Sequence, residues 1–414
     1  MRVLLINFER GWRGGERQTL LTALGLSEQG LLPTVLARQG EPLAQRLAVL
    51  GIPVIECKSP RQALWYLLRQ RDHYDIYHAQ TSAALTWLAS LKFLLKGKVV
   101  FTRRTAFPLR HEGKTETQYQ QRIKKLRWKW SKVDEFVAIS AAAAHDPQEL
   151  GFKPIIIPSA VEFVPADTDH IIAFTEQHDL GGRYVLGTVA ALTSEKDPET
   201  TIRAVHALWQ QRQDFVFLHF GAEGDAAPAA RALISELGLE NVYKLMGFER
   251  RIEDMYRLMH VFVLSSRFEA LGSSVLDAFL YAAPVVATQT GGLAELLADE
   301  RGIACEVGDF NAIAAACDRI LDDEPFRNQM ILTALRWVQK EHGVDTMVQS
   351  YIDLYHGRLR AAPEPSTDLS AEPLDPPAVE PALESKPEPV LEPVLASEPV
   401  FTVSEVEESA SKHT

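Results

Sequence analysis

Residues 265–297 read SSRFEALGSSVLDAFLYAAPVVATQTGGLAELL. A loop with Glu269 leads into a predicted helix that starts over 272–274 and carries Asp277, and an apolar strand follows at 284–288. The start of a helix offers unpaired N–H groups and the positive end of the helix dipole, which suit a phosphate. Carboxylates on either side suit the hydroxyl groups of a sugar. The stretch therefore predicts a site for a diphosphate that carries a sugar at each end.

Apolar runs typical of β-strands alternate with helical patterns on both sides of this stretch. The alternation predicts βαβ units, with parallel sheets that helices cover on both faces. Because the pattern restarts at residue 184, we expect two doubly wound, Rossmann-like α/β domains. Ligands of such sheets bind beyond the carboxyl ends of the strands, which places the site in the cleft between the domains. The predicted strands are 2–7, 33–37, 53–56, 75–78, 98–102, 135–139, 155–158, 184–190, 215–220, 242–246, 260–264, 284–288 and 303–307.

A domain junction is predicted over 165–182, where Pro165, Gly181 and Gly182 lie among charged residues. We expect helices at 15–29 and 81–95 in the first half of the chain. The predicted division is a first domain at 1–165, a second domain at 166–336, a helix at 337–360 that packs back toward the first domain, and a tail at 361–414.

The acidity of the chain belongs mostly to this tail. Residues 361–414 hold twelve Asp or Glu and two Lys or Arg, so they contribute −10 to the net charge of −12 and leave −2 for the other 360 residues. They also hold ten of the 23 prolines. Proline and like charge both oppose collapse, which predicts disorder. A tether that binds a partner is the alternative.

The cysteine pattern and the hydropathy predict a cytoplasmic protein. Cys57, Cys305 and Cys317 show neither disulfide nor metal-type spacing, which fits a reducing compartment. The apolar run at 3–7 is too short for a signal peptide, and no uncharged window is long enough to span a membrane. Peripheral contact with the inner face of a membrane stays open.

The order of motifs in 265–297 resembles the GT-B glycosyltransferases of the large retaining family 4. The matching parts are Glu269, seven residues, Asp277, then Ala283-Pro284, the Gly291–Gly292 turn and Glu295. The resemblance implies that Glu269 faces the donor sugar and that Asp277 binds the ribose hydroxyls of the nucleotide. Asp277 is shorter than the usual Glu, so the helix must come closer or a water must bridge. Alternatively, Asp277 is only a polar residue on a mostly buried helix.

The loop 191–198, ALTSEKDP, is similar to the phosphate-binding loop of the same family. Lys196 is then expected to pair with the diphosphate. The family usually has an Arg where this chain has Ala191, so one expected cation is missing. A solvated surface lysine is the alternative.

A glycine-rich loop, GWRGGERQ at 11–18, follows the first predicted strand. Gly14 and Gly15 are expected to let the backbone approach the phosphate or the sugar from the first domain, which the resemblance then makes the acceptor side. Arg13 and Glu16 are predicted to be exposed and to face the acceptor. A simple tight turn is the alternative.

Further positions follow from the resemblance. Gly221 and Gly247 end strands of the second, nucleotide-sugar-binding domain and are expected to border the base, unless they are ordinary strand-end glycines. Arg104 stands where the family often has a sugar-contacting His; together with Arg103 it is expected to supply the missing cation or to grip an anionic acceptor. A surface arginine pair is the alternative. His78 is a second candidate near the cleft.

A basic stretch between residues 103 and 132 holds ten Lys or Arg and two Glu. Its apolar residues at helical spacing are expected to pack on the first domain. The outward face of this helix then resembles the face of a helix that lies on an anionic membrane. The alternative is a helix face that is only in contact with solvent. Nucleic-acid binding is not expected, because no nucleic-acid module is recognised. The expected inward residues are Ile123, Leu126, Trp130 and Val133, and the outward ones are Lys124, Lys125, Arg127, Trp128 and Lys132.

Together these features predict a retaining glycosyltransferase that uses a nucleotide diphosphate sugar and a lipid-linked, lipopolysaccharide or other cell-envelope glycan acceptor. No cofactor is expected, and transfer is expected to be independent of metal. A sugar-nucleotide epimerase or a phosphorylase is an alternative on the same scaffold, and so is a non-catalytic binding protein. The predicted catalytic residues are Glu269, Lys196 and Arg104. The predicted donor-binding residues are Gly14, Gly15, Lys196, Gly221, Gly247, Gly272, Ser273, Ser274 and Asp277.

Overall fold

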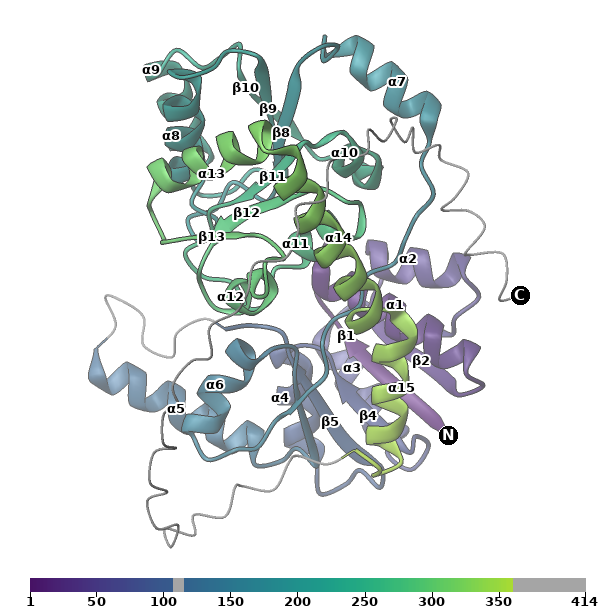
Figure 1. Ribbon diagram of the computed structural model, residues 1–414. Helices are drawn as coiled ribbons and strands as arrows, with labels where there is room; N and C mark the ends of the chain where they lie inside the picture. Colours follow the sequence, from purple (N-terminus) through teal and green to yellow (C-terminus); the bar gives the residue numbers. More distant parts are fainter. Residues whose placement is uncertain (107–114, 360–414) are drawn as a thin grey trace, which may run out of the picture. The chain divides into compact units, whose positions relative to one another are not determined.

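The computed structural model describes residues 1–106 and 115–359 (Figure 1). The predicted disorder of the tail lies outside the described residues, as does the part of the basic stretch at 107–114. In the described ranges, thirteen strands form two separate sheets, and every strand pairing is parallel.

The first sheet has the strand order β3-β2-β1-β4-β5-β6-β7. The chain leaves β1 toward β2 on one side and returns to β4 on the other, so β1 and β4 form the switch point of the sheet. Val3 pairs with Pro33 on one flank and with Ile76 on the other. The strands are β1 Arg2–Asn7, β2 Leu32–Arg38, β3 Val54–Cys57, β4 Ile76–Ala79, β5 Lys98–Arg103, β6 Glu135–Ala138 and β7 Ile155–Ile156.

Helices cover both faces of the first sheet. One face packs on α1 (Gly14–Glu28), α2 (Pro42–Val49) and α15 (Val344–Tyr355), which fill one buried apolar cluster with the strands. The other face packs on α3 (Pro60–Arg69), α4 (Ser82–Leu91) and α5 (Glu116–Trp130). A last helix, α6 (Ala141–Glu149), follows β6. Strands buried on both faces explain the nearly continuous apolar runs in the sequence.

The second sheet has the order β10-β9-β8-β11-β12-β13, with its switch point between β8 and β11. The cluster on one face includes residues of α8, α9 and α13, and the cluster on the other includes residues of α10, α11, α12 and α14. The strands are β8 Tyr184–Val189, β9 Phe215–Phe220, β10 Tyr243–Gly247, β11 Val261–Leu264, β12 Val285–Thr288 and β13 Ile303–Cys305. The helices are α7 Thr168–Gln177, α8 Pro198–Trp209, α9 Ala227–Glu236, α10 Ile252–Leu258, α11 Ser273–Leu280, α12 Gly292–Leu297, α13 Phe310–Asp322 and α14 Glu324–Glu341.

The prediction of two doubly wound α/β sheets is confirmed, and all thirteen predicted strands are present. The strand expected at 155–158 is shorter than predicted, because only Ile155 and Ile156 pair, with β6 at one edge of the sheet. The helix expected at 81–95 ends at Leu91. These differences lie at the ends of strands and helices, where the sequence pattern predicts the boundary least accurately.

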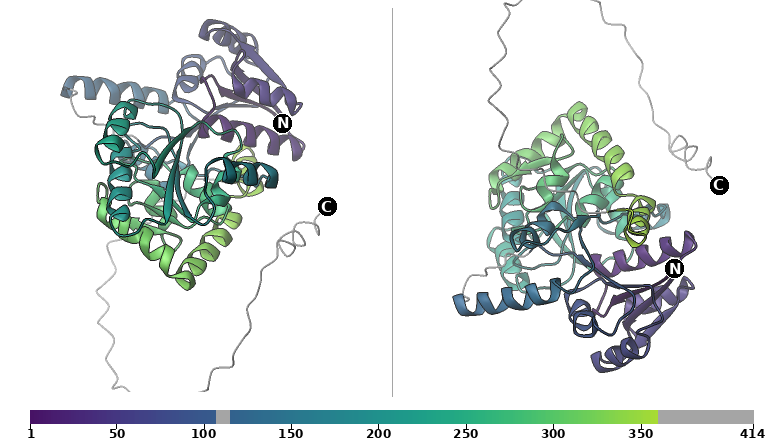
Figure 2. Two further views of the ribbon diagram at one scale, coloured as in Figure 1. Left: turned by 90° about the horizontal axis from the view of Figure 1, so that it is seen from above. Right: turned by 90° about the horizontal axis from the view of Figure 1, so that it is seen from below.

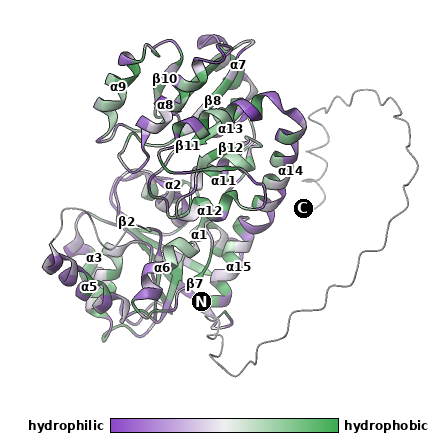
Figure 3. Cartoon of the chain, turned by 60° about the vertical axis from the view of Figure 1, so that its left-hand side comes forward, coloured by the Kyte–Doolittle hydropathy of each residue, from purple (hydrophilic) through white to green (hydrophobic). Residues whose placement is uncertain are grey.

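Helix α5 has the two faces that the sequence predicts. Of the four residues expected inside, Ile123 and Trp130 are buried while Leu126 and Val133 are half-buried, and the five residues expected to face outward are exposed. Figure 2 shows α5 extending along the edge of the fold, and Figure 3 shows it largely hydrophilic beside apolar strands. None of the helices in the described ranges combines the length and the hydropathy needed to cross a bilayer.

Candidate active site

Lys196 and Glu269 form an ion pair between two loops of the second sheet. Lys196 lies in the loop after β8, and Glu269 lies in the loop after β11, so the switch point of the sheet brings the two side chains together. Both side chains are largely shielded, with 25% and 15% of their surface exposed. The prediction placed both residues at one site, and the structure brings them into direct contact.

A second ion pair holds the Lys196 loop in place. Asp197 has a left-handed backbone with φ 48° at the start of α8, and its buried carboxylate accepts from Arg267 Nε at 3.0 Å and Nη2 at 3.2 Å. Ser265 Oγ donates to the Asp197 carbonyl at 2.7 Å. This set was not predicted; its only signals in the sequence are an Asp next to Lys196 and an Arg two residues before Glu269.

The Gly291–Gly292 turn fixes the backbone of Glu269. The N–H group of Gly292 donates to the Glu269 carbonyl at 3.0 Å. A Cβ on Gly291 would lie 2.0 Å from that same oxygen, and Gly291 has φ 49°. Only glycine allows this approach without strain, so the Gly-Gly motif positions the loop that carries Glu269.

The starts of two helices from different sheets face each other. Helix α1 begins at Gly14, and α11 begins at Ser273 after the N-cap Gly272. A Cβ on Gly14 would lie 3.2 Å from Ser273 Oγ. Unpaired N–H groups and the positive ends of both dipoles therefore meet at one place. Ser274 follows in the first turn of α11, so the predicted helix start is confirmed.

One turn further along these helices, Asp277 binds an arginine of the first sheet's helix layer. Arg17 Nη1 on α1 donates to both carboxylate oxygens of Asp277 at 2.8 Å. Asp277 thus lies on a mostly buried helix with a charged partner, so its carboxylate is not buried without compensation. Sequence reasoning did not single out Arg17, whose partner is 260 residues away.

The two glycines expected beside the base lie next to each other. Gly221 directly follows β9 and Gly247 ends β10, and the Gly221 N–H group donates to the Gly247 carbonyl at 2.8 Å. Gly221 also has to be glycine, because a Cβ there would lie 1.8 Å from the Ala190 carbonyl oxygen. Both glycines therefore stay close to the end of β8, where the Lys196 loop begins.

Arg104 lies beside the start of α1 with neutral partners. Its Nη2 donates to Gln80 Oε1 at 2.8 Å and its Nη1 to Ser159 Oγ at 3.2 Å, while a Cβ on Gly15 would lie 4.0 Å from its Cδ. Burial lowers the pKa of the Arg104 guanidinium.

The neighbouring Arg103 is also buried, but it pairs with the carboxylate of Asp146. The expected arginine pair is therefore divided, since Arg103 is already neutralised.

Two buried side-chain atoms in the described ranges lack a hydrogen-bond partner, and both lie near the carboxyl ends of the strands. They are Arg104 Nε, after β5, and Thr193 Oγ1, in the Lys196 loop after β8. Buried polar atoms are rarely left unsatisfied in native proteins. Their positions fit a site in which a polar ligand supplies the missing hydrogen bonds.

The expected exposure of Glu16 is wrong, and the candidate residue His78 has no exposed surface. Glu16 is buried rather than exposed, because its carboxylate accepts from Asn7 Nδ2 and from the Arg13 N–H group inside the first turn of α1. His78 is fully buried between Tyr355 and Thr102, whose hydroxyls lie 2.7 Å from its two ring nitrogens. Burial and the nearby Arg104 charge lower the pKa of His78 to about 3, so its ring is neutral near pH ~7.

Two family models cover most of the described chain. Residues 12–163 match Glycosyltransferase Family 4, and residues 172–337 match Glycosyl transferases group 1. The chain belongs to these glycosyltransferases. The two matches fall on the two sheets whose helix starts face each other.

Curated relatives of this glycosyltransferase match over shorter segments. The chain is 31% identical over 173 residues to alpha-D-kanosaminyltransferase of Streptomyces kanamyceticus, which covers 41% of this chain and 45% of that protein. It is 26% identical to the lipopolysaccharide core biosynthesis mannosyltransferase LpsB of Rhizobium meliloti, over 31% of this chain and 37% of that protein. The chain thus matches less than half the length of these relatives.

Solved structures show that the glycosyltransferase has the GT-B fold. Anabaena Alr3699/HepE, solved in complex with UDP and glucose, superposes with a TM-score of 0.76 at 18% identity. The match covers 86% of this chain and 100% of that chain. A glycosyltransferase from Rickettsia africae superposes with a TM-score of 0.71 at 18% identity.

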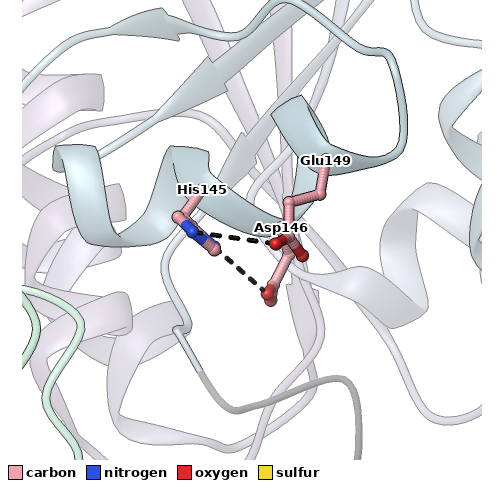
Figure 4. A group of neighbouring side chains, drawn as sticks. All are labelled: His145, Asp146 and Glu149. Carbon is pink, nitrogen blue, oxygen red and sulfur yellow. Dashed lines mark ion pairs between the residues drawn. The ribbon is translucent and has the colours of Figure 1, made fainter.

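A cavity of about 590 Å³ in this glycosyltransferase lies between α6 and the Glu269 loop. The Glu295 carboxylate closes one side by accepting from the N–H groups of Ala141 and Ala142, at the start of α6, at 3.2 and 3.0 Å. His145, Asp146 and Glu149 gather on α6, as Figure 4 shows, and the first two line the cavity. Asp146 already binds Arg103, so it has less charge left for a cation.

Proposed function

We propose that this chain is a retaining glycosyltransferase that moves a sugar from a nucleotide diphosphate sugar to a cell-envelope glycan or lipid-linked acceptor. The observation that carries the proposal is the meeting of Gly14 and Ser273 at two helix starts, with the Lys196–Glu269 pair next to the second of them, since a Cβ on Gly272 would lie 3.7 Å from Glu269 Cγ. Two helix starts and a lysine form a positive site for a diphosphate. A carboxylate next to that site suits the sugar attached to it.

The chemistry needs stabilisation of the leaving diphosphate more than it needs a strong base. Negative charge grows on the diphosphate as the glycosidic bond breaks, and the N–H groups at the starts of α1 and α11 are fixed before the reaction. Lys196 is held by Glu269 while no donor is bound; when a donor binds, Lys196 turns to the phosphate and Glu269 is left to face the sugar. Retention of anomeric configuration is the stereochemistry of the family that the motifs resemble.

For the donor, the neighbouring structure with UDP and glucose supports uracil as the first base to test. The glycines at 221 and 247 leave backbone exposed where the base is expected. For the acceptor, the relative LpsB acts in lipopolysaccharide core biosynthesis, which supports an envelope glycan.

Peripheral contact with an anionic membrane is part of the proposal. The exposed face of α5 carries Lys124, Lys125 and Arg127 around Trp128, whose surface is 45% exposed, and the exposed Lys132 follows the end of the helix. On the same side of the sheet, Trp65 and Phe93 are 59% and 84% exposed. Basic side chains and aromatic rings on one surface favour the interface of an anionic bilayer.

Transfer independent of metal is also proposed, because helix N-termini and Lys196 offer the positive charge that a cation supplies elsewhere. The test is sugar release from UDP-, GDP- and ADP-sugars before and after treatment with EDTA, with the anomeric configuration of the product read by NMR. Unchanged turnover and a retained anomer support the proposal. Binding without turnover would favour a non-catalytic binding protein, and exchange of sugar stereochemistry without transfer would favour an epimerase.

A further inference from the structure

The pair formed by Arg17 and Asp277 joins the two sheets through their helices. Arg17 is on α1 and Asp277 is on α11, and one guanidinium nitrogen lies 2.8 Å from each carboxylate oxygen. The two side chains are 22% and 12% exposed. Burial opposes the charge of Arg17, but the attraction of Asp277 outweighs it and raises the pKa of the guanidinium.

The position of this pair relative to the proposed diphosphate site is fixed by the helices. Gly14 meets Ser273 at the two helix starts, and Arg17 meets Asp277 one turn further on in each helix. A diphosphate at the helix starts would therefore have the ion pair directly beside it. The group attached to the diphosphate on that side is the ribose of the nucleotide, if the sugar lies toward Glu269.

The length of Asp277 makes the arginine relevant. An aspartate carboxylate lies one methylene closer to its helix than a glutamate carboxylate, so it reaches less far toward a ligand. Each carboxylate oxygen has two acceptor positions, and Arg17 occupies one on each. The remaining positions are free to accept from two vicinal hydroxyls, provided that Arg17 holds the carboxylate in one orientation.

We propose that Arg17 is a positioning residue for the donor, which orients Asp277 toward the ribose from the opposite domain. The inference rests on the proposed function, since it needs a nucleotide diphosphate at the helix starts. It assigns part of ribose recognition to the first domain, so that the ribose pocket is complete only when α1 and α11 are in contact. The contact with Arg17 also explains how the short side chain of Asp277 can bind the ribose at this position.

The test compares ligands with and without a ribose on matched variants. Titration calorimetry measures binding of UDP, 2′-deoxy-UDP and inorganic pyrophosphate to wild type, Arg17→Met, Arg17→Lys and Asp277→Asn. Loss of a charged contact that orients the ribose predicts about ten- to a hundredfold weaker UDP binding for Arg17→Met and Asp277→Asn. Pyrophosphate binding stays unchanged, and the preference for UDP over 2′-deoxy-UDP is lost.

A rescue variant separates positioning from general stability. In the Arg17→Met background, Asp277→Glu restores the longer side chain and is expected to recover most of the UDP affinity. Equal or tighter UDP binding by Arg17→Met overturns the inference, because Arg17 would then be neutral or a competitor of the ribose. Weak UDP binding without rescue by Asp277→Glu, while pyrophosphate still binds, overturns it as well. Wild type that binds neither UDP nor pyrophosphate would instead remove the proposed function.

Discussion

Lys196 Nζ donates a charged hydrogen bond to Glu269 Oε2, although the two residues are 73 positions apart in the sequence. Parallel pairing of β8 with β11 makes this possible, because the loops after both strands emerge at the same edge of the sheet. Arg267 and Asp197 join the same two loops a second time. The two loops of the second sheet thus bring a cation and a carboxylate to one place.

Replacement of Lys196 tests the role of the cation. Lys196→Ala removes the charged hydrogen bond to the diphosphate, which is worth about 1.5–3 kcal/mol, and we expect kcat/KM to fall about ten- to a hundredfold. Lys196→Arg, as the matched control, keeps the charge and retains part of the activity. Steady-state kinetics with the best donor give the comparison, and wild-type turnover in Lys196→Ala would remove this residue from the site.

Replacement of Gly291 tests the backbone that holds Glu269. A Cβ at Gly291 meets the Glu269 carbonyl at 2.0 Å, so Gly291→Ala is expected to cost about 1–3 kcal/mol of unfolding free energy and to lower activity. Gly308→Ala is the control, because Gly308 also has a positive φ, 85°, but has open space around it. Urea unfolding and turnover are measured for both. Equal effects of the two substitutions would mean that the contact with Glu269 is unimportant.

Substitution of the two arginines at the end of β5, Arg103 and Arg104, is expected to change the stability of the protein differently. Arg103→Met takes the arginine partner from the largely buried Asp146 carboxylate, which keeps, among the residues that the structure describes, only the 3.9 Å contact with His145, and should cost about 3 kcal/mol of stability. Arg104→Met removes a cation that has no acidic partner within the described residues, so it should leave the melting temperature unchanged or raise it while lowering turnover. Differential scanning calorimetry with activity assays decides this. Full activity in Arg104→Met would contradict its place in the site.

The buried His78 predicts a loss of stability in acid. Its pKa is about 3 in the folded protein and 6.5 as an ordinary value, so the unfolded chain binds the proton first as pH falls. Stability is unaffected above pH ~6.5 and falls by about 1.4 kcal/mol for each pH unit below it, about 2 kcal/mol at pH ~5. His78→Gln should show a smaller decrease between pH ~7 and ~5 than wild type does.

The basic face of α5 predicts selective binding to anionic vesicles. Lys124→Glu with Lys125→Glu should weaken cosedimentation with phosphatidylglycerol vesicles by at least tenfold, since each cation near the surface contributes about 1 kcal/mol. Neutral phosphatidylcholine vesicles are expected to bind little of either protein. Lys340→Glu on α14, where the lysine is 82% exposed, serves as the matched control. Equal binding of the wild-type protein to anionic and neutral vesicles would contradict the proposed membrane face.

The sequence predicted the parts of the fold and of the site that depend on local pattern. Continuous apolar runs identified the strands, and the glycine-rich loops and the start of α11 followed from turn and helix chemistry. The partner of Asp277 could not be predicted, because the contact with Arg17 depends on how α1 lies against α11. The burial of Glu16 and His78 was also missed, since a polar residue near a strand end looks the same whether it meets a ligand or a buried hydroxyl.

The central claim is that the starts of α1 and α11 hold a diphosphate between them, with Lys196 beside it. Titration calorimetry of UDP-, GDP- and ADP-sugars into the wild-type protein and into Lys196→Ala tests this most directly. We predict that at least one of the three binds wild type and binds the variant at least tenfold more weakly. Absence of binding by all three to wild type, or equal affinity for both proteins, would contradict the claim.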